Sequence, residues 1–207
     1  AGLADMELYE VAFPRQAARA RLREAIAAAD AVLCDANMPA VALEKLAAAS
    51  ALRPLHAIAI SPAKAVRLAG LLPRIACLFM NRAEARRLAD ADDKATPAEL
   101  AAALREKGLA AGVITAGSAG ATGFDASGIF SIAAPKARRI ADVTGAGDAL
   151  AGATVAALMR GLPLAAALPE GLAAAMLTVE QASAVVTLDN EAFAAALALV
   201  PAPVKVA

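Results

Sequence analysis

Short apolar segments alternate with helix-forming segments along most of this chain, and this alternation restricts the fold more than any other feature. The apolar segments are residues 31–35, 55–60, 75–79 and 112–115. Helical patterns surround them at residues 15–29, 41–49, 63–72, 82–89 and 97–107. Short, continuously apolar strands that alternate with helices are typical of a parallel sheet covered on both faces. The sequence therefore predicts an α/β fold with a mainly parallel sheet.

The pattern changes after Gly117. Residues 121–125 and 129–132 favour a β-hairpin around residues 126–128. Helices are expected at 146–160, 164–182 and 191–199, and the tail from Pro201 is expected to be loose. No repeat or linker divides the chain, so residues 1–207 are expected to form a single domain.

Charge and composition exclude several classes of protein. The 20 basic and 20 acidic residues balance, which argues against nucleic acid or an anionic membrane surface as a partner. Cys34 and Cys77 lie in apolar segments and, with the single His56, provide neither a zinc site nor a disulfide framework. The first residues lack a secretory signal, and no segment is apolar enough to span a bilayer. These features predict a cytoplasmic protein.

The segment DVTGAGDAL, residues 142–150, combines two glycines and two aspartates directly ahead of a long helix. Glycines let the backbone approach a ligand closely, and the first turn of a helix presents free N–H groups to an anion. An ionised Asp148 would repel a bound phosphate. Its position beside an anion site is explained if it is the base that activates the acceptor of a transferred phosphoryl group. The motif thus indicates phosphoryl transfer to an alcohol. The alternative is an aspartate that only caps the helix.

Other phosphate-binding and nucleophile motifs do not match. No Gly-Lys pair exists for a P-loop, and Leu150 occupies the last glycine position of a dinucleotide fingerprint. The spacing of Gly117, Ser118 and Gly120 does not form a G-x-S-x-G elbow.

The segment DVTGAGD resembles the D-x-x-G-A-G-D signature of the PfkB (ribokinase-like) carbohydrate and nucleoside kinases. Asn81 and Glu84 resemble the N-x-x-E motif of that family, and the segment from Thr115 to Gly120 resembles its T-x-G-x-x-G nucleotide segment. The resemblance covers most of the chain. It implies a three-layer α/β/α ribokinase-like (Rossmann-like) fold and ATP-dependent phosphorylation of a hydroxymethyl group on a sugar or nucleoside.

The resemblance also implies roles for the residues around the glycines. Asp148 would be the catalytic base, and Gly145, Ala146 and Gly147 would form the anion hole. Asp142 and Thr144 resemble positions near a monovalent-cation site, K⁺ in some members. The alternative for these last two is loop hydrogen bonding.

Further roles concern the nucleotide. Asn81 and Glu84 would organise Mg²⁺ and phosphate through water; the alternative is a helix cap with a solvated acid in the first turn. Thr115 and Gly117 would lie near the ATP phosphates, with Gly120 close by, whereas a plain turn at the end of a strand is the alternative.

A narrower resemblance is to pseudouridine kinases. It rests on GLADMELYE, VLCDANMP, ISPAKAVRL and MLTVEQASAVVTLDN. It implies that Asn37 contacts substrate; the alternative is a turn residue ahead of Pro39.

Members of the family are longer than this chain. The resemblance implies that the sequence is the N-terminally truncated catalytic part, without the first strands and the lid. A sheet that lacks strands exposes an edge, so a homodimer or association through that edge is expected. A second hypothesis is a nucleotide-binding remnant without turnover, and a third is an unrelated α/β protein.

Overall fold

The computed structural model describes residue 10 and residues 19–183 and 189–206. The helix expected over residues 15–29 is therefore described only in part, as α2 (Ala20–Ala28). Residues 2–9 and 184–188, which contribute to the narrower resemblance, lie outside the described residues.

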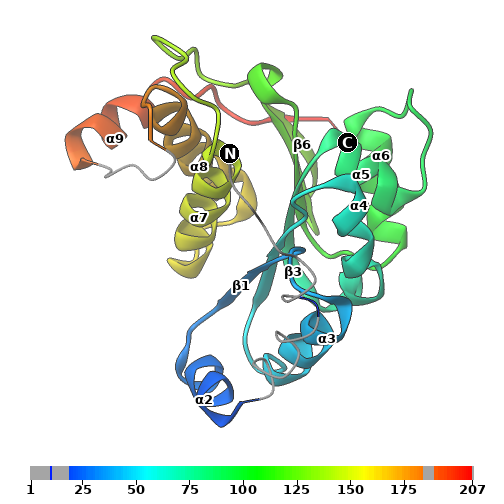
Figure 1. Ribbon diagram of the computed structural model, residues 1–207. Helices are drawn as coiled ribbons and strands as arrows, with labels where there is room; N and C mark the ends of the chain where they lie inside the picture. Colours follow the sequence, from blue (N-terminus) through cyan, green and yellow to red (C-terminus); the bar gives the residue numbers. More distant parts are fainter. Residues whose placement is uncertain (1–9, 11–18, 184–188, 207) are drawn as a thin grey trace.

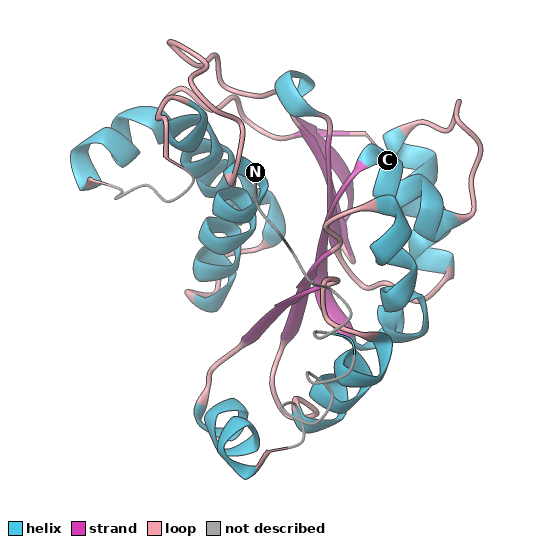
Figure 2. Ribbon diagram, in the orientation of Figure 1, coloured by secondary structure: helices cyan, strands magenta, loops and turns pink. Residues whose placement is uncertain are grey.

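The described residues contain a seven-stranded sheet whose strands lie side by side in chain order (Figure 2). The strands are β1 (Val32–Asp35), β2 (Leu55–Ile58), β3 (Ile75–Asn81), β4 (Gly112–Thr115), β5 (Ala121–Asp125), β6 (Gly128–Ile132) and β7 (Val204–Lys205). Neighbours from β1 to β4 are parallel, and neighbours from β4 to β7 are antiparallel. The parallel first half and the β5–β6 hairpin confirm the prediction.

Helices cover both faces of this sheet, which gives the expected three layers (Figure 1). One face carries α3 (Ala40–Ala49), α4 (Pro62–Ala65), α5 (Arg82–Ala89) and α6 (Pro97–Glu106). The other face carries α7 (Ala146–Met159) and α8 (Leu164–Val179), with α9 (Asn190–Leu197) beside α8. Side chains of a strand alternate between faces. Leu78 accordingly joins the buried cluster under α3 to α6, and Phe79 joins the cluster under α7 and α8.

Two expectations about local structure were wrong. The helix expected over residues 63–72 is α4 followed by a 3₁₀ segment, η1 (Val66–Arg74), which contains Pro73 near its end, where the missing N–H prevents a regular α-helix from continuing. The tail is not loose: β7 pairs with β6, and the Val206 N–H donates to the Ile129 carbonyl at 2.8 Å. The residues around a two-residue strand that pairs with a segment far away in the sequence give little indication that a strand forms there.

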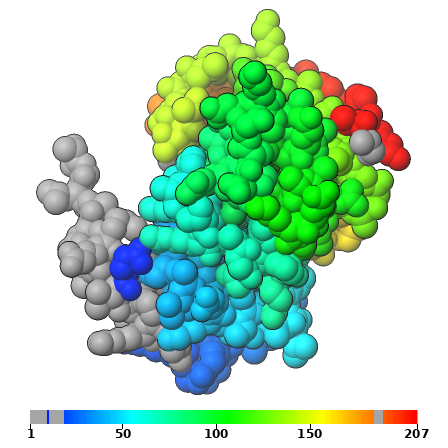
Figure 3. All heavy atoms as spheres, turned by 90° about the vertical axis from the view of Figure 1, so that its right-hand side faces the viewer, coloured from blue at the N-terminus to red at the C-terminus, as the bar shows by residue number. Residues whose placement is uncertain are grey.

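The space-filling view in Figure 3 shows α3 to α6 packed into one continuous surface on their side of the molecule. Among the described helices, none has both the length and the apolar character needed to cross a membrane.

The burial of His56 in β2 predicts that the stability of the fold depends on pH. The residue is 4% exposed, and its Nδ1 has no hydrogen-bond partner among the described residues. Burial lowers the pKa of His56, so the unfolded chain binds the proton more readily than the folded one. Stability should therefore fall as the pH drops through the ordinary histidine pKa.

Replacing His56 by leucine should remove this dependence. Urea unfolding at pH 7.5 and 5.5 should show that the wild type loses about 1 kcal/mol more stability than His56→Leu over that interval. Equal losses in the two proteins would contradict the assignment of this pH dependence to His56.

Candidate active site

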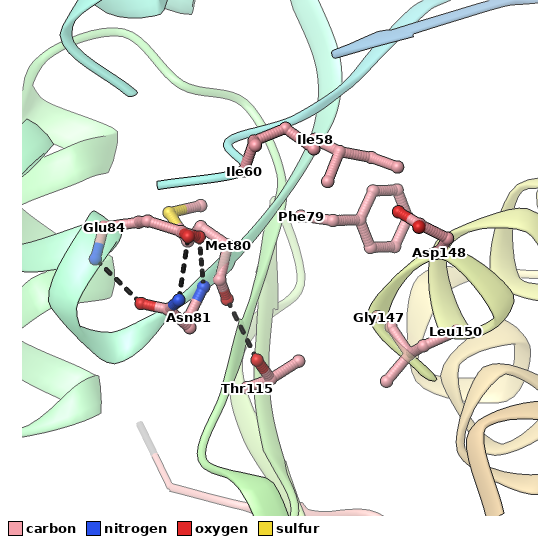
Figure 4. Close-up of a pocket in the computed structure, with 10 residues that line it drawn as sticks. All are labelled: Ile58, Ile60, Phe79, Met80, Asn81, Glu84, Thr115, Gly147, Asp148 and Leu150. Carbon is pink, nitrogen blue, oxygen red and sulfur yellow. Dashed lines mark hydrogen bonds between the residues drawn. The ribbon is translucent and has the colours of Figure 1, made fainter. Parts of the chain in front are cut away.

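A pocket of about 290 Å³ opens at the carboxyl ends of β2, β3 and β4, opposite the start of α7 (Figure 4). It is lined by Ile58, Ile60, Phe79, Met80, Asn81, Glu84, Thr115, Gly147, Asp148 and Leu150. Five predicted site residues thus meet here from three parts of the chain: Asn81, Glu84, Thr115, Gly147 and Asp148. Ligands of open α/β sheets bind at this end of the strands.

The first turn of α7 carries Asp148. Gly145 precedes the helix with φ at 81°, a left-handed conformation that glycine adopts without strain. Asp148 is the third helical residue, and no side chain caps this terminus, so the alternative of a capping aspartate is wrong. Its exposed side chain accepts no hydrogen bond from the described residues. In Figure 4 it extends into the pocket on the side opposite Asn81 and Glu84.

Two backbone amides at this terminus are open to a ligand. Within the described part of the chain, the N–H groups of Gly147 and Asp148 donate no hydrogen bond. The Ala146 N–H instead donates to the Val143 carbonyl at 3.3 Å. Apart from its chain neighbours and the backbone of its own helix, no atom of the described residues lies within 4 Å of the place that a Cβ on Gly147 would take. The turn can therefore accept an anion directly against its backbone.

Asn81 and Glu84 form a reciprocal cap at the start of α5. The Asn81 side chain accepts from the Glu84 N–H at 3.0 Å and donates to Glu84 Oε1 at 2.8 Å. Glu84 Oε2 accepts from the Asn81 N–H at 2.7 Å. Glu84 is only 4% exposed, so the alternative of a solvated acid is wrong. Burial raises the pKa of Glu84, and the hydrogen bond from the Asn81 backbone offsets part of this effect.

A Glu84→Gln substitution should separate stability from ligand binding. A raised carboxyl pKa means that the folded state favours the protonated form, and this contribution to stability is lost as the pH rises through the folded-state pKa. The thermal midpoint of Glu84→Gln, relative to that of the wild type, should therefore be higher at pH 8 than at pH 5. Its affinity for Mg·ATP should fall by at least about tenfold.

The control is Glu99→Gln. Glu99 holds the same position in the capping box of α6, but it is exposed and lies outside the pocket lining. If Glu84→Gln binds Mg·ATP as tightly as Glu99→Gln, Glu84 has no role in the nucleotide site.

The glycines after β4 shape a turn next to the pocket. Thr115 lines the pocket, and its Oγ1 donates to the Met80 carbonyl at 3.4 Å. Gly117 and Gly120 have φ of 58° and 103° and do not line it. A Cβ on Gly120 would strike the Ile132 carbonyl, whereas the space beside Gly117 is open. Gly120 is therefore required by packing, and Gly117 remains available to a ligand.

Asp142 and Thr144 form a tight turn just before Gly145. Asp142 Oδ1 accepts from the Thr144 N–H at 2.9 Å, and hydrogen bonds from Thr144 lower the pKa of Asp142. This is the loop hydrogen bonding that was the alternative for these residues. Both lie outside the pocket lining.

Asn37 lies in a separate polar cluster at the ends of β1 and β2. Its backbone N–H donates to Asp35 Oδ1 at 2.8 Å, and Lys64 Nζ donates to Asn37 Oδ1 at 2.5 Å. Arg67 closes the turn by donating to three carbonyls, among them that of Asn37 at 2.9 Å. Asn37 does not line the pocket. No sequence signal linked Asn37 to Lys64.

Sequence reasoning also missed the apolar wall of the pocket, which Ile58, Ile60 and Phe79 form beside Asp148 (Figure 4). Ile60 has φ at 69°, and the Ser61 N–H donates to the Ala59 carbonyl across it at 2.8 Å. This is a strained γ-turn with a β-branched residue at its centre. No residue pattern marks such a turn in advance.

The donor set of the pocket fits a hydrated magnesium ion beside a phosphate chain. No cluster of three or more His, Cys, Asp or Glu side chains exists in the described residues, so they form no direct cage for a metal. Mg²⁺ commonly keeps several waters and binds through one carboxylate and substrate phosphates. Both Glu84 oxygens already accept hydrogen bonds from Asn81, so Glu84 would act on the ion through its water shell, and the open amides at Gly147 and Asp148 would face the phosphate.

The chain is similar to known proteins in both sequence and fold. The family described as "pfkB family carbohydrate kinase" matches residues 6–191. A carbohydrate kinase from Agrobacterium tumefaciens superposes with a TM-score of 0.81 at 42% identity, and the match covers 97% of this chain and 64% of that kinase. The chain thus spans less than two thirds of that relative. No curated protein matches.

Two more distant structures share the fold. A ribokinase from Arabidopsis thaliana, complexed with ribose and ATP, superposes with a TM-score of 0.74 at 22% identity, covering 86% of this chain and 59% of the other. A ribokinase from Thermotoga maritima gives 0.73 at 21% identity, with coverage of 85% and 59%.

Proposed function

This chain belongs to the pfkB family of carbohydrate kinases, and on that basis we propose that it transfers the γ-phosphoryl group of ATP to a hydroxymethyl group of a sugar or nucleoside. The proposal treats residues 1–207 as one kinase domain. One observation carries it. One pocket combines three features: the Asp148 carboxylate and the amides at the start of α7, none of which has a hydrogen-bond partner within the described part of the chain, and the buried Asn81–Glu84 pair on the opposite side.

Each part of the pocket has a chemical task in this reaction. Asp148 accepts the proton of the acceptor hydroxymethyl group as its oxygen attacks the γ-phosphorus, and ADP leaves. The N–H groups of Gly147 and Asp148 stabilise the negative charge on the transferred phosphoryl oxygens. Asn81 and Glu84 hold the water shell of Mg²⁺, which neutralises charge on the phosphate chain when it is bound. Thr115 and Gly117 contribute to the phosphate side of the site.

The acceptor we favour is pseudouridine, which would yield the 5′-phosphate. The support for this choice is the likeness of four segments to pseudouridine kinases, among them the one that contains Asn37. A ribokinase of similar fold binds ribose, so simple pentoses are the competing acceptors.

We also propose a monovalent-cation site, a cellular compartment and an oligomeric contact. A monovalent cation such as K⁺ would bind near Asp142 and Thr144. Cys34 and Cys77 are buried free thiols, which supports a reducing compartment such as the cytoplasm. The β1 strand has one strand neighbour among the described residues, and self-association along its other edge is the proposed oligomeric contact.

Two measurements test the proposal. Mg·ATP is first titrated calorimetrically into the 207-residue chain, and transfer of labelled γ-phosphoryl is then assayed with pseudouridine, uridine, ribose and fructose. Binding with transfer to pseudouridine is the expected result. Binding without transfer to any acceptor would favour a nucleotide-binding protein without turnover. A folded chain that binds no Mg·ATP would refute the proposed function.

A further inference from the structure

The loop that leads into the glycine turn is attached to the end of α8 through Glu180. The Arg138 N–H donates to Glu180 Oε1 at 2.6 Å, and its guanidinium donates to Oε2 at 2.5 Å from one nitrogen and 3.0 Å from another. Arg139 Nε donates to the Glu180 carbonyl at 2.7 Å. Two adjacent arginines are thus held by the side chain and the backbone of one residue.

Backbone hydrogen bonds continue this attachment towards the site. The Ala141 and Asp142 N–H groups both lie within hydrogen-bond distance of the Val179 carbonyl, at 2.8 and 3.4 Å. Asp142 in turn accepts from the Thr144 N–H, and the next residue, Gly145, is the N-cap of α7. An unbroken series of contacts therefore runs from Glu180 to the turn that presents the open amides.

The fixed end of this series is the glutamate. Glu180 is 5% exposed, whereas the Arg138 side chain is 76% exposed. Hydrogen bonds from Arg138 lower the pKa of Glu180, so it stays ionised at neutral pH. The two guanidinium groups also lie at the carboxyl end of α8, where the helix dipole favours positive charge.

The helix that carries Glu180 is packed tightly against α7. Gly171 of α8 meets α7 so closely that a Cβ there would strike Thr154 Oγ1 and lie 2.7 Å from the Leu150 carbonyl. The two helices can therefore shift little relative to each other. Because Glu180 directly follows α8, its contacts fix residues 138–142 relative to α8, and therefore relative to α7 and the Asp148 side chain.

We propose that Glu180 is a positioning residue of the nucleotide site, which aligns the turn before α7 so that the Gly147 and Asp148 amides meet the transferred phosphoryl group. This inference rests on the proposed function of the pocket. Because Glu180 is buried, loss of its partner lowers stability as well. The carboxylate also accepts from both the backbone and the guanidinium of Arg138, so the contact fixes the course of the segment before the turn. Its loss should therefore weaken ligand binding in protein that is still folded.

The chain offers a matched pair of contacts for the test. Arg160 in the turn after α7 donates to Glu170 of α8 at 2.5 Å, so Glu170 makes the same kind of contact on the same helix but not with the segment before the turn. We would compare Glu180→Gln with Glu170→Gln by peptide hydrogen exchange and by calorimetric titration of Mg·ATP. If Glu180→Gln does not fold, the same comparison is made with the exposed arginine partners, as Arg138→Gln against Arg160→Gln.

We expect Glu180→Gln and Arg138→Gln to exchange about tenfold faster over residues 138–146 and to bind Mg·ATP about tenfold more weakly. The two control variants should match the wild type in both measurements. Wild-type affinity in both Arg138→Gln and Glu180→Gln would overturn the positioning role while leaving the proposed function intact. A wild-type chain that binds no Mg·ATP would refute the proposed function and this inference with it.

Discussion

Asp148→Asn is expected to reduce phosphoryl transfer by about 10²- to 10⁴-fold while Mg·ATP still binds with an affinity near that of the wild type. Asparagine has nearly the same shape as aspartate but cannot accept the proton of the acceptor hydroxyl at neutral pH. The Asp148 side chain is exposed and accepts no hydrogen bond from the described residues, so the substitution should not disturb the fold. The measurement is kcat with saturating acceptor and ATP, together with calorimetric binding of Mg·ATP.

The control for this variant is Glu191→Gln. Glu191 is also an exposed acid in the first turn of a helix, α9, and it does not line the pocket. Its removal should leave both rate and binding unchanged. Wild-type turnover in Asp148→Asn would exclude Asp148 as the base and would require another proton acceptor.

Gly147→Val is expected to abolish detectable binding of Mg·ATP, which means a loss of about 100-fold or more. Beyond its chain neighbours and the backbone of its own helix, no atom of the described residues lies within 4 Å of the Cβ position of Gly147, so the folded chain has room for the larger side chain. That same space is where a phosphate would approach the open amides of the first turn. The valine methyl groups would therefore compete with the ligand rather than with the protein core.

Gly152→Val provides the matched control, because Gly152 lies on the same helix and its Cβ position is equally open to the rest of the described structure. Both variants should keep the thermal midpoint close to that of the wild type, since valine has a slightly better helix propensity than glycine. If Gly147→Val binds Mg·ATP like Gly152→Val, the first turn of α7 is not the phosphate site.

Local features of the fold could be predicted because their causes lie within a few residues of sequence. The apolar segments became β1 to β4, and the hairpin around residues 126–128 formed as expected. α5 and β4 have the predicted bounds. Asn81 and Glu84 are three residues apart, the spacing at which an N-cap and a first-turn acid can bond reciprocally.

Other features depend on partners that are distant in the sequence. The tail forms β7 only because the outer edge of β6 offers unpaired backbone groups to Val204 and Lys205. Asn37 meets Lys64 because parallel strands bring the ends of β1 and β2 together. The strained turn at Ile60 is stable only because the surrounding structure holds it, so the residue types at this position do not predict it.

The candidate site divides in the same way. Sequence alone determined the chemical groups, because a glycine turn ahead of a helix and an acid in its first turn depend only on neighbouring residues. Tertiary structure alone decided that Glu84 is buried, that Asp148 lies across one pocket from it, and that Glu180 holds the segment before the turn. Burial and long-range contacts arise when the sheet and its two helical layers close around the core. Their energies depend on that packing and not on local spacing.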